Sequence, residues 1–97
     1  MEQPTHHKLG YLLPVVEIPA PNTTKLYLPG GLTLMYSYST CVGFAYKGKR
    51  TFTATQYSMT TSKHMKNVFE FDKWDRVPAE FFDALLESAL REVFNHG

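Results

Sequence analysis

Acidic residues are absent from the middle of this 97-residue chain. Between Ile18 and Phe69 there are six Lys or Arg and no Asp or Glu, whereas residues 70–97 carry seven acids and three bases. The formal net charge of +1 therefore hides a basic half and an acidic half. A surface of one sign indicates either an anionic partner or a self-complementary assembly, and it does not distinguish between them.

Cysteine and long apolar runs are also scarce. The single cysteine, Cys41, excludes an internal disulfide framework and favours a reducing compartment. No apolar run approaches the roughly 20 residues of a membrane-spanning helix. The N-terminus lacks the charged start and apolar stretch of a secretory signal. We therefore expect a cytoplasmic protein that does not enter a membrane.

The length and composition favour a single small domain of the α+β class. At 43% hydrophobic residues, the chain can bury one core. Residues 1–10 are polar and are predicted to be a flexible N-terminus, followed by one domain over residues 11–97. The apolar run from Tyr11 to Ile18 is interrupted by Pro14, which permits only an edge strand or an extended arm.

Alternation of side chains predicts an antiparallel sheet of three to five strands. Every second residue from Leu32 to Tyr38 is Leu or Tyr, and this period of two is typical of a half-buried strand. A short strand at residues 25–28 and a turn at Pro29-Gly30-Gly31 precede it. A hairpin with its tip at Lys47-Gly48-Lys49-Arg50 follows it.

Two helices are expected, a short one after the hairpin and a long one at the C-terminus, packed on one face of the sheet. Thr60-Thr61-Ser62 resembles an N-cap before a short helix. Pro78 and Glu80 suit the first turn of the long helix, which is predicted to end near Phe94. Its apolar residues cover an arc of roughly 200°, wider than one sheet requires. A second copy of the protein, or the N-terminal arm and the connector around Trp74, would cover the excess.

The hairpin is the first candidate site. Basic residues alternate there with aromatic ones, a combination that binds single-stranded nucleic acid because cations meet phosphates and rings stack on bases. A charged hairpin tip is equally an ordinary solubility feature. The candidate nucleic-acid-binding residues are Tyr46, Lys47, Lys49, Arg50, Tyr57, Lys63 and Lys66.

The second candidate site is the start of the short helix. Backbone amides, hydroxyls and an ammonium at the positive end of a helix would make an anion site. The alternative is that Thr60 or Thr61 only caps the helix, while Lys63 and Lys66 lie on its solvent-exposed face. The glycines of a P-loop are missing. The candidate anion-binding residues are Thr60, Thr61, Ser62, Lys63 and His64.

Catalytic, metal and cofactor sites are not expected. His64 and Cys41 have no evident orienting group, and Cys41 is better explained as a small buried strand residue. Scattered histidines do not supply the three or four converging ligands of a metal site. A row of strand hydroxyls is explained by β propensity and cross-strand pairing, although a flat hydroxyl face is also a possible partner surface. The row comprises Thr33, Ser37, Ser39, Thr51, Thr53 and Thr55.

Two segments resemble small uncharacterised proteins encoded by bacteriophages and prophages. One is Tyr36–Phe44, which contains an SYxTxV run, and the other is Tyr57–Lys66, which contains YSxTTSKH at the entry to a short helix. The resemblance implies a phage origin, a place in the host cytoplasm and no assigned activity. It coincides with the candidate anion site, but a shared fold-forming turn would produce it equally well.

Three functions follow as hypotheses, all without enzymatic activity. The first is a phage accessory module that contacts nucleic acid through its basic hairpin and sheet face. The alternative is a module that binds and inhibits a host protein through the C-terminal helix or the edge strand. The third is a small-anion or nucleotide binder at Thr60–His64. A homodimer is compatible with each, because the acidic helix and basic sheet are complementary surfaces.

Overall fold

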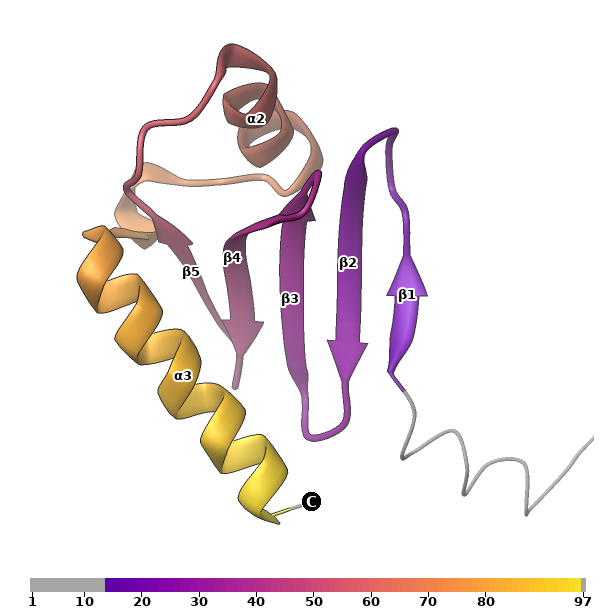
Figure 1. The fold of residues 1–97 in the computed structure, drawn as a ribbon, viewed down its shortest axis with the longest axis vertical. Helices are drawn as coiled ribbons and strands as arrows, with labels where there is room; N and C mark the ends of the chain where they lie inside the picture. Colours follow the sequence, from indigo (N-terminus) through magenta and orange to yellow (C-terminus); the bar gives the residue numbers. More distant parts are fainter. Residues whose placement is uncertain (1–13, 97) are drawn as a thin grey trace, which may run out of the picture.

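The computed structural model describes residues 14–96. One sheet contains six strands in chain order, all antiparallel to their neighbours except β5 and β6, which are parallel (Figure 1). The strands are β1 (Val15–Glu17), β2 (Thr23–Leu28), β3 (Leu32–Ser37), β4 (Thr40–Tyr46), β5 (Lys49–Thr53) and β6 (Arg76–Val77). The helical segments are α2 (Met59–Lys63), the π-helix η1 (His64–Val68), the 3-10 helix η2 (Lys73–Asp75) and α3 (Ala79–His96). The predicted α+β class is confirmed, with more strands than the three to five expected.

Two-residue turns connect β3 to β4 and β4 to β5. β3 ends at Ser37, and Tyr38 and Ser39 alone connect it to β4, with a φ of 55° at Tyr38. The turn between β4 and β5 is Lys47-Gly48, with φ values of 52° and 79°. Positive φ in such turns matches the right-handed twist of the flanking strands. The turn lies within the predicted segment Lys47-Gly48-Lys49-Arg50, for which the sequence left the loop length open, and Lys49 and Arg50 belong to β5.

A bulge in β4 exchanges the faces of the sheet to which Cys41 and Val42 point. The register passes from Met35 opposite Gly43 to Tyr36 opposite Cys41, so Val42 is an extra residue. Consequently Cys41 lies on the face that α3 covers, whereas Val42 is buried on the other face. Simple alternation along β4 does not predict this exchange.

Both faces of the sheet carry a core. On one face α3 packs against β3 and β4, and the rings of Phe44 and Phe82 lie 5.6 Å apart. On the other face the α2–η1 segment and the chain after it are packed through Met65 and Phe69. The sheet is therefore a middle layer, with α3 on one side and the α2–η1 segment on the other.

The two predicted helices form, but the short one begins earlier than expected. Ser58 caps α2, because its hydroxyl accepts a hydrogen bond from the Thr61 amide at 3.3 Å. The predicted cap at Thr60 or Thr61 was therefore wrong, and both residues lie in the first turn. Several hydroxyl residues stand close together here, so the sequence alone does not single out the cap. At α3 the Pro78 carbonyl accepts from the Phe82 amide at 2.9 Å, as expected for a first turn.

Helix α3 is narrower than the sheet beneath it. A helix is about 10 Å wide and strands lie about 4.8 Å apart, so one helix covers about two strands. Phe81 and Leu85 are 59% and 46% exposed on one flank of α3, and Phe94 is 65% exposed. Trp74 does not cover them, since it is itself 82% exposed. The part of the N-terminal arm before Pro14 lies outside the described residues.

Candidate functional site

The structure divides the predicted basic hairpin between the two faces of the sheet. Tyr46 and Lys49 form a cross-strand pair and, with Lys47, line a hollow beside α3. Arg50 follows Lys49 in the strand and therefore points to the opposite face, where it lines a different hollow with Lys25. These bases do not form one continuous patch for a nucleic-acid strand.

On the α3 side, one acid of the C-terminal half is bonded to the hairpin. The Lys47 Nζ lies 2.6 Å from Glu92 Oε1, and the Tyr46 hydroxyl donates to the same oxygen at 2.6 Å. The hydrogen bond that Lys47 donates to Glu92, followed by the charge of that carboxylate, raises the pKa of the Lys47 ammonium. The separate hydrogen bond that Tyr46 donates to Glu92 is the main cause that raises the pKa of the Tyr46 phenol. Because the pair is exposed, it contributes little to stability.

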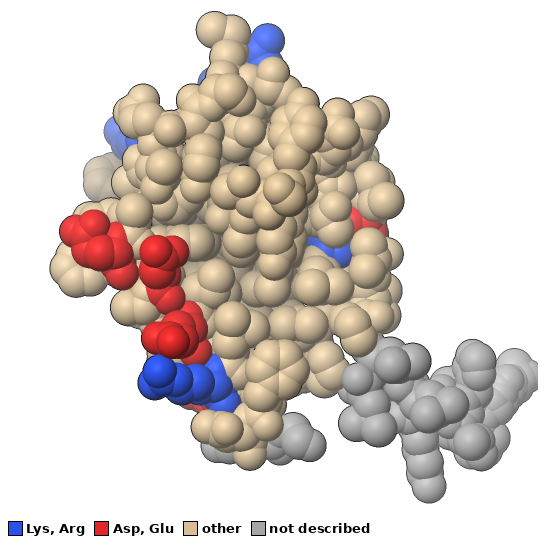
Figure 2. All heavy atoms as spheres, in the orientation of Figure 1, with Lys and Arg blue, Asp and Glu red and all other residues tan. Residues whose placement is uncertain are grey.

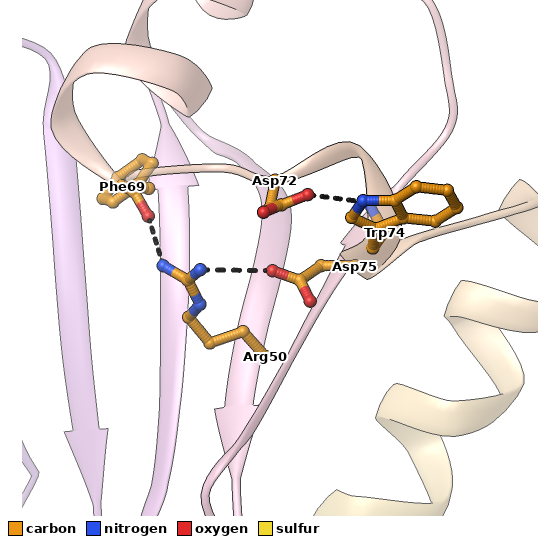
Figure 3. A network of polar contacts seen from close by, with 5 residues as sticks. All are labelled: Arg50, Phe69, Asp72, Trp74 and Asp75. Carbon is orange, nitrogen blue, oxygen red and sulfur yellow. Dashed lines mark hydrogen bonds and ion pairs between the residues drawn. The ribbon is translucent and has the colours of Figure 1, made fainter.

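On the opposite face, Arg50 is held by two groups (Figure 3). Its Nη2 lies 3.2 Å from Asp75 Oδ2, and its Nη1 donates to the Phe69 carbonyl at 3.4 Å. Asp75 belongs to η2, and the Asp72 carboxylate caps that helix by accepting from the Trp74 amide at 3.0 Å. The guanidinium therefore fastens the connector to the sheet. Two bases of the basic half, Lys47 and Arg50, are thus paired with acids of the acidic half.

The remaining predicted nucleic-acid residues lie elsewhere. Lys63 in α2 and Lys66 in η1 are exposed, and neither has an acidic partner within residues 14–96. Tyr57 is half buried and packs against the core that contains Phe52. A ring in that position is only partly available for stacking on a base.

The predicted anion site contains a buried hydrogen-bond chain. Ser37 Oγ lies 3.0 Å from Thr61 Oγ1 and 2.8 Å from His64 Nδ1. The Thr61 amide is already bonded to Ser58. These bonds join α2 and η1 to the end of β3, and they leave Thr60, Ser62 and Lys63 as the exposed members of the site. The sequence did not indicate Ser37 as a partner, because it stands 24 and 27 residues away.

Neither the Ser37–His64 pair nor Cys41 has the properties of a catalytic nucleophile. Ser37 is 1% exposed, so a substrate cannot reach its hydroxyl. Burial raises the pKa of the Cys41 thiol, which keeps it protonated and poorly reactive. Within residues 14–96, no group of three or more His, Cys, Asp or Glu could hold a metal ion. In the same part of the chain, no helix is long and apolar enough to cross a membrane.

The α3-side face of the sheet continues beyond α3 as an apolar row. Val16 pairs with Leu26, Leu26 with Leu34, and Leu34 with Phe44, so these side chains share one face. Leu34 and Phe44 are buried beneath α3, Leu26 is half buried, and Val16 is 59% exposed. On the face seen in Figure 2, acidic side chains gather along α3, and the part toward β1 and β2 is almost free of charge.

Residues 15–84 match the family described as "Family of unknown function (DUF8033)". The chain belongs to this family. The match extends from β1 through β6 into the first part of α3. No curated protein and no solved structure matches the chain. The family description names no activity or source, so the phage origin stays a prediction.

Proposed function

We propose that this protein is a non-enzymatic protein-binding module, and that its binding surface is the uncovered α3-side face over β1 and β2. The proposal rests on the apolar row that Val16, Leu26, Leu34 and Phe44 form across the sheet. Val16 is more than half exposed in a face that has almost no charge (Figure 2). Such a face has few cations for phosphates, which supply most of the affinity for nucleic acid. It favours an apolar partner surface instead.

The flank of α3 forms one wall of this surface. Leu85 borders the hollow on the β4–β5 side of the helix. At 100° per residue, Leu90 and Phe94 lie roughly opposite Leu85 and therefore face β1 and β2. Leu90 is half buried and Phe94 is 65% exposed. We call this proposed surface, which one helix flank and two strands form, the apolar trough.

The occupant that fits this trough is an amphipathic helix of another protein. Packed helices lie about 8–10 Å apart, and this spacing would place a helix beside α3 and over β1 and β2. Its apolar stripe would contact Val16, Leu26 and Phe94. This is the helix-in-groove form of recognition, in which a few apolar anchors supply the affinity.

Substitutions at Val15, Val16 and Phe94 test the proposal. Val16 and Val15 are 59% and 58% exposed, but they point to opposite faces. We expect Val16→Asp and Phe94→Ser to lose a partner protein that the parent and Val15→Asp retain at high salt. Affinity capture would find the partner, and titration calorimetry with the purified partner would measure the loss. Equal binding by Val16→Asp and Val15→Asp would overturn the assignment of this face.

Nucleic-acid binding is the second candidate function, and fewer residues support it. Lys49, Lys63 and Lys66 have no acidic partner within the described residues. Fluorescence anisotropy with labelled single-stranded DNA, double-stranded DNA and RNA at about 50 and about 200 mM salt would test it. Binding that falls steeply with salt and is weakened by Lys63→Gln with Lys66→Gln would favour this candidate over a protein partner.

A further inference from the structure

A hollow lies between α3 and the β4–β5 hairpin, on the flank of α3 away from the apolar trough. Its volume is about 260 Å³. Phe44, Leu85 and Ala89 form its apolar wall, and Lys49, Thr51 and Ser88 line it with polar groups. Apolar walls with a few polar groups are typical of small-molecule sites.

Thr51 is the unusual member of this lining. It is 5% exposed, and its hydroxyl has no hydrogen-bond partner within residues 14–96. Thr53, two residues along the same strand, is equally buried, but its Oγ1 lies 2.9 Å from Thr55 Oγ1 and accepts from the Thr55 amide at 3.2 Å. Buried polar groups are almost always bonded. The Thr51 hydroxyl is therefore a group to which an occupant of the hollow can hydrogen-bond.

The charges around the hollow favour a single negative charge on its occupant. Glu92 is bonded to Lys47 and Tyr46 at the rim. Lys49 has no acidic partner within the described residues. Lys49 and Thr51 stand two residues apart in β5, so their side chains leave the same face of the strand. One ammonium and one hydroxyl are thereby presented together beside an apolar wall.

We propose that this hollow binds a small monocarboxylate whose apolar body is about the size of one aromatic ring. The carboxylate accepts hydrogen bonds from the Lys49 ammonium and the Thr51 hydroxyl, and the apolar body lies against Phe44, Leu85 and Ala89. A dianionic phosphate would need a second free cation, and a neutral ligand would leave Lys49 without a counter-charge. The site is separate from the trough proposed for a protein partner.

Benzoate is a suitable probe, because it combines one carboxylate with one apolar ring. We expect benzoate to shift the amide NMR signals of Thr51, Ser88 and Ala89 in a saturable manner. Benzamide, which has the same ring without the charge, and sodium chloride at equal ionic strength should have little effect. A response to chloride equal to that of benzoate would mean an adventitious ion only and would overturn the proposal.

Four variants assign the contacts. Lys49→Gln and Thr51→Val should each weaken benzoate binding on the order of tenfold, since each removes a hydrogen bond to a charged group. Lys63→Gln and Thr53→Val are the matched controls, because neither residue lines the hollow, and they should bind benzoate as the parent does. Loss of binding in the controls, or full binding in both Lys49→Gln and Thr51→Val, would contradict the assignment. The NMR spectra also show whether each variant is folded.

Discussion

Replacing Thr51 and Thr53 by Val tests whether the Thr51 hydroxyl lacks a partner in the protein. Valine has nearly the shape of threonine, so each change removes one hydroxyl with little change in packing. Both residues are buried in β5, at 5% and 2% exposure, and both point to the α3 side. The pair therefore differs mainly in hydrogen bonding.

The expected magnitudes follow from those bonds. Thr53→Val removes two contacts with Thr55, at 2.9 and 3.2 Å. A hydrogen bond contributes about 0.5–1.5 kcal/mol, so the free energy of unfolding should fall by about 1–2 kcal/mol. Thr51→Val removes no bond within the described residues. Its free energy of unfolding should be unchanged or higher, because an unsatisfied buried hydroxyl is itself costly.

Urea unfolding followed by circular dichroism measures both free energies, and thermal unfolding checks them. For a domain of this size each 1 kcal/mol changes Tm by about 4–8 °C. Thr53→Val should therefore melt at least about 4 °C below Thr51→Val. If Thr51→Val were destabilised as much as Thr53→Val, the Thr51 hydroxyl would have a partner within the protein. The argument for a ligand in the hollow would then lose its main support.

Three further predictions concern the sheet and its buried polar groups. Gly43→Ala should destabilise the protein by about 1–3 kcal/mol, because a Cβ there would meet the Phe52 ring at 2.5 Å; an unchanged Tm would mean that the ring moves aside. Ser37→Ala should cost about 1–3 kcal/mol by leaving the Thr61 hydroxyl and the His64 imidazole with one partner fewer. Hydrogen exchange should then increase first in α2 and η1, and uniform protection would contradict the anchoring role. The Cys41 thiol should react with iodoacetamide much more slowly in the folded protein than in urea near pH 8, because burial raises its pKa; equal rates would show that it is accessible and ionised.

Patterns between neighbouring residues predicted much of the fold correctly. Local patterns indicated the strands β2 to β5 but not β6, and Pro78 with Glu80 indicated the start of α3. Pro14 indicated that the N-terminal segment is an edge strand or an extended arm, and β1 lies at the edge of the sheet. These features depend on backbone sterics and on side-chain periodicity, which residues close in the chain determine.

The sequence by itself thus determined the elements and the α+β class, and the tertiary structure decided what their surfaces can do. The excess of bases from Ile18 to Phe69 suggested a phosphate-binding face. The fold instead bonds Lys47 to Glu92 and Arg50 to Asp75, on opposite faces of the sheet. Charge composition cannot predict this, because each pair joins residues that only folding brings together. The uncovered apolar face arises in the same way, from one helix that is narrower than the sheet on which it packs.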